Sequence, residues 1–320
     1  MLQQLKKFLS SLYRLPRGIG KLINLRHLEL EETSSLTELP KGIGKLSSLR
    51  TLTKFIVSGD DNNEARNIEM LKNLKHLQGV LCLDGLGNIV SGVEAEKAEL
   101  KHKEKLIGLT LEFFVQKIEE AMEDHVDDVI EALQPNPNLE SLHVLYHQGT
   151  RLPSWIMMLM MLTNLRELIL RNCEKCENLP PLGNLPSLEL LEIGYMYHVK
   201  TMCLRFLGMG THDGIPNQDE VLTTSSKIAF PKLKRLGFYG LTKWEDWYDW
   251  TSWKECSLIM PNLGCLTIEY CPKLKALPHL LQTATVQELI ISGCPQLEQR
   301  CRKEKGEDWT KISHIPCITR

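Results

Sequence analysis

The sequence has no apolar run long enough to cross a lipid bilayer. Its longest uninterrupted run, Trp155 to Leu162, has eight residues, against the roughly 20 that a membrane-spanning helix needs. The first twelve residues, MLQQLKKFLSSL, also lack the continuous apolar core and small-residue cleavage site of a secretory signal. We therefore predict a chain without a membrane span, located in the cytoplasm, with the nucleus as a second location.

The sequence also has no excess of charge of one sign. Its 38 Lys and Arg residues face 40 Asp and Glu residues, and the formal net charge is −2. Nucleic acids and anionic membranes attract proteins through a strong positive field, which this balance does not supply. We therefore expect no nucleic-acid partner.

Signatures of catalysis and of cofactor binding are missing as well. The sequence contains no HExxH, no GxSxG and no GxxxxGK[ST] phosphate loop. The nearest strings to a phosphate loop, at 18–21 and 42–45, lack the required glycine spacing and the hydroxyl residue that should follow. We expect no enzyme activity and no cofactor.

One metal alternative stays open, because Cys173 and Cys176 form a CxxC pair. A tetrahedral zinc site needs four ligands, and no second CxxC or closely spaced His pair lies nearby in the sequence. A structural role for both cysteines is therefore the favoured interpretation, and we predict no metal site.

What the sequence does contain is repetition. LPRGIGKLINLRHL, from Leu15, matches LPKGIGKLSSLRTL, from Leu39, at a shift of 24 residues. The shorter pattern LxxLxL recurs along the chain at intervals of 23 to 33 residues, with one gap of 45. Its middle residues are Leu28, Leu52, Leu81, Leu109, Leu142, Leu168, Leu191, Leu236, Leu266 and Leu289. The copy Leu77-Leu81-Leu83 carries a one-residue insertion.

This period predicts a leucine-rich-repeat solenoid, an α/β repeat fold of horseshoe form. Each LxL pair is a short parallel strand whose alternate side chains point inward, and a lone repeat cannot bury them without its neighbours. Cys173, Cys271 and Cys294 recur three residues past the strand, and Leu-Pro pairs such as Leu179-Pro180 recur further along. Proline there favours a convex side of irregular, 3-10 and short helical segments.

We expect residues 1–320 to form a single array of about ten to eleven irregular repeats. Three segments depart from the minimal repeat. Residues 116–133 combine helical apolar spacing with many carboxylates and predict an acidic helix on the convex side. Residues 209–227 lack any period and predict a flexible inserted loop, and residues 300–320 predict a C-terminal cap.

The concave face is the first candidate for partner binding, because side chains between the inward leucines line up into ladders about 4.8 Å apart. Their mixed charges suit protein recognition. The predicted set is Arg26, His27, Glu29, Arg50, Thr51, Thr53, His143, Arg166, Glu167, Glu192, Lys234, Arg235, Thr267 and Glu288.

A second candidate is aromatic. Four of the six tryptophans fall in WEDWYDWTSW, at Trp244, Trp247, Trp250 and Trp253. Aromatic anchors dominate many protein interfaces, which predicts partner binding here. The alternative is that Trp244 and Trp247 pack into the convex side.

Several motifs, in a fixed order over nearly the whole chain, resemble one family. They are the two LPxGIGKLxxLRxL segments, LPPLGNLPSLELLEI at 179–193, LxIxxCP around Cys271 and Cys294, and EDWxKISHIP near the end. WEDW at 244–247 and EALQPNPNLESL at 131–142 fit the same pattern. The sequence resembles the C-terminal leucine-rich-repeat region of plant coiled-coil nucleotide-binding leucine-rich-repeat (NLR) disease-resistance proteins.

The resemblance implies an intracellular immune receptor whose nucleotide-binding switch lies upstream and is absent from this chain. We expect a non-enzymatic protein-recognition module that senses effectors or guarded proteins in defence and restrains that switch. The expected partners are a pathogen effector, a guarded host protein or the receptor's own nucleotide-binding domain. The alternative is a free-standing leucine-rich-repeat adaptor or inhibitor with no immune role.

The predicted strand register can be tested by substituting two adjacent residues. Leu168→Asp places a carboxylate at an inward position and should unfold the neighbouring repeats, because a buried, unpaired charge costs several kcal/mol. Glu167→Ala, at an outward position, should leave the melting temperature nearly unchanged. Thermal unfolding followed by circular dichroism measures both, and equal losses would contradict the register.

Overall fold

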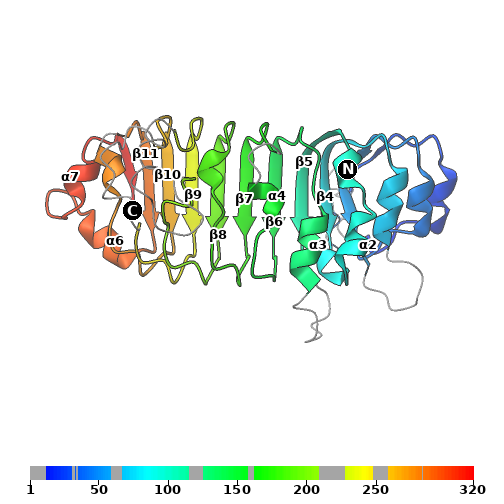
Figure 1. Ribbon diagram of the computed structural model, residues 1–320, viewed down its shortest axis with the longest axis horizontal. Coiled ribbons are helices and arrows are strands. Elements are labelled where there is room, and N and C mark those ends of the chain that lie inside the picture. The colour runs from blue at the N-terminus through cyan, green and yellow to red at the C-terminus, as the bar shows by residue number, and fades with distance from the viewer. Residues whose placement is uncertain are drawn as a thin grey trace, which may run out of the picture. The chain divides into compact units, whose positions relative to one another are not determined.

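The architecture comes from a computed structural model (Figure 1). It describes residues 12–30, 33, 35–58, 67–114, 125–157, 162–208, 228–247, 259–282 and 284–320. The chain divides into two compact units, Met1–Gly149 and Thr150–Arg320. The predicted loop at 209–227 and residues 115–124 lie outside the described residues.

The described residues of unit 1 form six short strands. The first two, β1 (His27–Leu28) and β2 (Thr51–Leu52), pair in parallel, and a second sheet has the parallel order β3-β4-β5-β6. The bounds in this second sheet are β3 Lys54–Ile56, β4 Gln78–Asp84, β5 Lys105–Glu112 and β6 Ser141–Leu145. Consecutive repeats therefore contribute neighbouring strands, as the period predicts.

The inward positions of unit 1 stack leucine on leucine. Leu81 lies opposite Leu109, which in turn lies opposite Leu142, and all three are buried. Burying one such side chain contributes about 1.5–3 kcal/mol, which only the adjoining repeat makes available. The sequence insertion in Leu77-Leu81-Leu83 falls where the β4–β5 register shifts, between Gly79 and Val80.

Glycine in the repeated GIGK segments has a packing role. A β-carbon on Gly20 would come within 2.7 Å of the Gly42 Cα, and one on Gly42 within 2.9 Å of the Gly20 Cα. The two segments form 3-10 turns, η1 (Arg17–Lys21) and η2 (Lys41–Lys45), that lie against each other. Close approach of two repeats, and not a phosphate group, explains these glycines.

Unit 1 has short helical segments between its strands. They are η1, η2, η3 (Asn67–Asn73), η4 (Leu86–Asn88), α2 (Gly92–Glu96), η5 (Leu100–His102) and α3 (Val126–Ala132). The acidic helix predicted over 116–133 is described only in its last part, where α3 buries Val129 and Ile130. No helix within the described ranges is long and apolar enough to span a membrane.

A buried lysine and a buried asparagine join successive repeats of unit 1. Lys103 Nζ donates to the carbonyl oxygens of Leu71, at 2.7 Å, and Leu74, at 3.2 Å. Asn136 Nδ2 in turn donates to the Lys103 carbonyl oxygen at 2.8 Å. Burial lowers the pKa of Lys103 to about 8. These bonds add a side-chain donor to carbonyl groups at repeat bends and so join one repeat to the next; the carbonyl groups of Leu71 and Lys103 also accept backbone N–H groups of their own turns.

Unit 2 continues the pattern with the parallel strand order β7-β8-β9-β10-β11-β12. Figure 1 shows β8, β9, β10 and β11 as neighbouring arrows. The bounds are β7 Glu167–Arg171, β8 Leu190–Gly194, β9 Arg235–Tyr239, β10 Cys265–Glu269, β11 Glu288–Ser292 and β12 Cys317–Thr319. The helical segments are α4 (Ser154–Met157), η7 (Leu182–Asn184), η9 (His279–Gln282), α6 (Pro295–Arg300) and α7 (Trp309–Ile312).

A left-handed residue directly follows each of the strands β7 to β11. These residues, with φ between 54° and 65°, are Asn172, Tyr195, Gly240, Tyr270 and Gly293. The turn directs the following side chain into the core, where Cys173, Cys271 and Cys294 are fully buried. The thiol of Cys294 donates to the carbonyl oxygen of Ser292 at 3.4 Å. The recurring cysteines are therefore small core residues that also bond the backbone.

A buried carboxylate organises the C-terminal end of unit 2. Asp308 accepts from Arg300 Nη2 at 3.1 Å, forms an ion pair with Lys311 Nζ at 2.9 Å and accepts from the Leu277 backbone N–H at 2.9 Å. Lys311 also donates to the Leu277 carbonyl oxygen at 2.7 Å. This network ties the segment around α7 to the preceding repeat and gives a physical reason for the EDWxK motif.

Asp308→Asn should destabilise the chain by about 3 kcal/mol at pH 7, because it removes the charge that pairs with buried Lys311 and with partly exposed Arg300. Burial alone would raise the pKa of Asp308, but the bonds from Arg300 and Lys311 outweigh it, and the pKa lies below its usual value. A depressed carboxyl pKa stabilises the fold above the unfolded value of about 4. The difference between wild type and variant in urea unfolding should therefore shrink as pH falls below about 4. A difference that does not change with pH would contradict the ionic role.

Candidate functional site

The side chains available to a partner lie at alternate strand positions, between the buried leucines. We call these positions the sheet face of each unit. In unit 2 the register aligns three ladders across this face. They are Glu167–Leu190–Arg235–Cys265–Glu288–Cys317, Ile169–Glu192–Gly237–Thr267–Ile290–Thr319 and Arg171–Gly194–Tyr239–Glu269–Ser292.

An ion pair and an aromatic ring form the centre of the unit 2 sheet face. Arg171 Nη2 donates to Glu192 Oε2 at 2.5 Å, and the Arg171 Cζ lies 5.0 Å from the centroid of the Tyr239 ring. The Arg171 Nε is buried and has no hydrogen-bond partner among the described residues. Two neighbours therefore fix the guanidinium, while one of its donors is left unsatisfied.

The tyrosine ring lies across a glycine. A β-carbon on Gly237 would come within 2.7 Å of the Tyr239 ring, and the hydroxyl of Thr267 hydrogen-bonds to the phenol. Burial, followed by the Glu192 carboxylate, raises the pKa of Tyr239 above its usual value. Thr267, predicted from the sequence as a contact residue, is thus mostly covered.

At the start of the strands, charges of opposite sign alternate. Glu189 lies between Arg166, at 3.3 Å from Nη1, and Lys234, at 2.6 Å from Nζ. The hydrogen bond from Lys234 holds the pKa of Glu189 below its usual value. Both cations are exposed, so the row contributes charge pattern more than stability.

At the end of the strands, exposed tyrosines border the face of unit 2. Tyr195 and Tyr270 occupy left-handed turn positions, and the next repeat has a glycine beside each ring. A β-carbon on Gly240 would meet the Tyr195 ring at 2.6 Å, and one on Gly293 the Tyr270 ring at 2.7 Å. Each ring thus lies against the backbone of a glycine in the next repeat and remains partly exposed to solvent.

The sheet face of unit 1 is apolar at one end and acidic at the other. Val80 and Ile107 are about half exposed, whereas Asp84 pairs with Lys54 Nζ at 2.7 Å. Burial and the nearby Asp84 raise the pKa of Glu112. His143, predicted from the sequence, lies in the ladder between these two ends, opposite Thr110.

The N-terminal contact residues predicted from the sequence have mixed roles. Arg26, His27, Glu29 and Arg50 are exposed. The Thr51 hydroxyl lies 2.9 Å from His27 Nδ1, and the Thr53 hydroxyl accepts from the Leu30 backbone N–H at 2.8 Å. Both threonines therefore connect neighbouring strands.

Two of the four tryptophans predicted to bind a partner are buried. Trp244 and Trp247 pack edge to face against each other, with ring centroids 4.6 Å apart, and both contact Phe238. Trp244 Nε1 donates to the Asp246 carbonyl oxygen at 2.8 Å and Trp247 Nε1 to that of Ala276 at 3.0 Å. Both indole rings are buried and both N–H groups are hydrogen-bonded within the protein. These two tryptophans therefore belong to the core. Trp250 and Trp253 lie outside the described residues.

The CxxC pair is buried. Cys173 and Cys176 both have no exposed surface, and the Cys176 N–H donates to the Cys173 carbonyl oxygen at 3.2 Å. Among the described residues no group of three or more His, Cys, Asp or Glu side chains could hold a metal ion. The arrangement is that of two core thiols in a turn.

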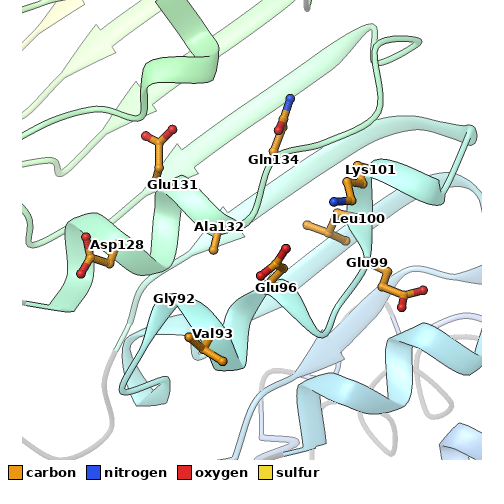
Figure 2. Close-up of a pocket in the computed structure, with 10 residues that line it drawn as sticks. All are labelled: Gly92, Val93, Glu96, Glu99, Leu100, Lys101, Asp128, Glu131, Ala132 and Gln134. Carbon is orange, nitrogen blue, oxygen red and sulfur yellow. The ribbon is translucent and has the colours of Figure 1, made fainter.

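A groove of about 410 Å³ lies beside α2 and α3 in unit 1 (Figure 2). Its lining combines Val93, Leu100 and Ala132 with carboxylates and a single cation, Lys101. Asp128 and Glu131 of α3 belong to this lining. Some of the carboxylates predicted on this helix therefore line the groove.

The sheet faces hold ion pairs, a tyrosine and half-exposed aliphatic side chains. Such a surface can orient and grip a protein segment. The sequence interpretation found Glu192, Arg166 and Lys234 but missed Arg171, Tyr239, Lys54 and Asp84. Arg171, Tyr239 and Asp84 each lie one position after the second buried side chain of a strand, where the LxL pattern has ended. Lys54 lies on β3, which has no LxxLxL pattern of its own.

Parallel ladders of one strand per repeat define a leucine-rich-repeat protein. Residues 68–196 match the family model described as R13L1/DRL21 LRRs. At3g14460 of Arabidopsis thaliana, named as a disease resistance protein, is 33% identical over 70% of this chain and 15% of its own length. Disease resistance protein RGA2 of Solanum bulbocastanum is 28% identical over 84% of this chain and 35% of its own length.

The chain belongs to the leucine-rich-repeat regions of the plant disease-resistance proteins of NLR type. It spans about a third or less of the length of these relatives. It is thus a defence-related leucine-rich-repeat module.

Gly237→Ala should displace the Tyr239 ring, because the new methyl group would occupy its place. The phenol then loses its burial, and its pKa should fall towards the ordinary value of about 10, with a stability cost of about 1 kcal/mol. Spectrophotometric titration of tyrosinate measures this, and Tyr239→Phe identifies the transition. In the control Gly264→Ala, the added carbon meets nothing closer than 3.6 Å. An unchanged titration in Gly237→Ala would show that the ring is not held there.

Proposed function

We propose that this chain is the protein-recognition module of a plant intracellular immune receptor. It senses a pathogen effector or a guarded host protein, and it restrains the nucleotide-binding switch of the same receptor. The module is non-enzymatic and acts in the cytoplasm and the nucleus.

The Arg171–Glu192–Tyr239 cluster on the unit 2 sheet face is the observation that carries the proposal. Its three side chains are fixed by one another, so a partner need not order them on binding. The Nε of Arg171 is buried and has no hydrogen-bond partner in the described part of the chain. Departures of this kind are typical of functional surfaces.

Charged residues around the cluster supply orientation. The row Arg166–Glu189–Lys234 alternates in sign, and Arg235 is exposed in the adjoining ladder. Complementary charge controls association rate and register more than affinity. Partly exposed Ile169 and Ile290 supply the apolar contact between the charges.

Restraint of a switch can be tested with the protein encoded directly upstream of this chain in its genome. The expected finding is a reading frame with a GxxxxGK[ST] domain that co-purifies with the chain. Arg235→Glu should weaken that complex at least tenfold, because it reverses a central charge. Lys303→Glu makes the same charge change at an exposed residue outside the sheet face and should have no effect.

Two results would contradict the proposal. An upstream domain that does not bind the chain would favour a free-standing adaptor or inhibitor. Equal weakening by Arg235→Glu and Lys303→Glu would show that only net charge matters and that the sheet face is not the contact surface.

A further inference from the structure

A second surface of unit 2 gathers positive charge, away from the sheet-face ladders. A cavity of about 290 Å³ lies among the bends that follow β7, β8 and β9. Its walls come from three consecutive repeats, through 177–179, through residues between 198 and 206, and through Lys243. Binding at this cavity would be separate from binding at the sheet face.

The backbone around the cavity is firmly held. The segments carrying Lys200 and Glu245 run in parallel, with the Glu245 N–H donating to the Lys200 carbonyl oxygen at 2.9 Å. The floor includes Leu179 and Phe206, both buried. The Phe206 ring packs on Phe230 with centroids 5.3 Å apart. The cavity is therefore part of the repeat framework.

The charge of the lining is unbalanced. Lys200, Arg205 and Lys243 line the cavity with only one carboxylate, Glu177. None of these three cations forms an ion pair among the described residues, whereas Lys234, Lys275 and Arg171 elsewhere in unit 2 each do. Glu245, which is not part of the lining, pairs with Lys275 Nζ at 2.7 Å, and that bond, with a smaller contribution from Lys200, lowers the pKa of its carboxyl group.

Polar groups complete the lining. His198 and the side chains of Asn178 and Thr201 belong to it. The Nδ1 of His198 lies 2.8 Å from the Glu174 carbonyl oxygen. A carbonyl oxygen can only accept, so this nitrogen donates, and the bond fixes the ring. Cations, hydroxyl and amide together offer many donors and few acceptors.

We propose that this cavity binds a small anion that carries two phosphate groups. The three cations outnumber the one carboxylate of the lining by two, which favours a ligand with several negative charges over a single carboxylate, and an arginine fork and two lysines are suited to phosphate oxygens. A volume near 300 Å³ is at the small end of ligand pockets and limits the ligand to a compact molecule. This site goes beyond the proposed protein recognition and does not depend on it.

Isothermal titration of the intact chain with pyrophosphate tests the proposal. We expect binding of one pyrophosphate per chain, weakened at least tenfold in the double variant Lys200→Gln, Arg205→Gln. Both side chains are exposed, so the melting temperature of the variant should stay unchanged. The control, Lys303→Gln with Lys305→Gln, removes the same charge at exposed residues outside the cavity and should bind as wild type does.

Other outcomes would overturn the proposal. These are no heat of binding at millimolar pyrophosphate, or equal weakening in the control, which would indicate general charge attraction. A parallel arm uses vesicles of neutral lipid with or without a bisphosphorylated inositol headgroup. If the chain binds both pyrophosphate and the vesicles with the bisphosphorylated headgroup, the site accepts lipid headgroups as well as free ligands. If it binds pyrophosphate alone, the site takes a free ligand.

Discussion

The fold depends on leucine side chains that each repeat cannot bury by itself. Leu168, Leu191, Leu236, Leu266 and Leu289 face one another across successive strands of unit 2, and each is buried. Because the inward positions are committed to this shared interior, recognition must use outward residues. In the described part of this unit these include the alternate residues of the strands and the bends that follow them. The proposed protein-binding face uses the first and the proposed anion cavity uses the second.

The bends follow from the same constraint. A chain that leaves a strand must turn at once if its next side chain is to reach the core, which explains the left-handed residue after each of β7 to β11. Cysteine is suited to the following position because its small thiol packs and also donates to a nearby carbonyl oxygen. At other places a buried polar side chain forms the hydrogen bonds to the backbone. Lys103 and Asn136 do so in unit 1, and Asp308 does so in unit 2. Polar atoms inside the repeats thus satisfy backbone groups that leucine cannot.

The strand register could be predicted from the sequence, because an LxL pair with period-two burial has only one orientation that hides both leucines. Strands β3 and β12 could not, since Lys54–Ile56 and Cys317–Thr319 carry no such pattern. In the candidate site, the sequence predicted that Glu192 faces outward. Its contact with Arg171 could not be predicted, because it depends on the side-chain rotamers of two residues on neighbouring strands. The burial of Trp244 and Trp247 depends on Phe238 and on a carbonyl group of the next repeat. The basic cavity depends on three separate bends, whose approach no local pattern records.

The repeats within a unit share one core and should therefore unfold cooperatively. Deuterium exchange at the backbone amides of β8, β9 and β10, followed in increasing urea, tests this directly. We expect the amides of these internal strands to lose protection together, over one narrow range of urea concentration. Strands that lose protection one at a time, at well-separated urea concentrations, would contradict a shared interior and with it the assignment of the outward residues to recognition.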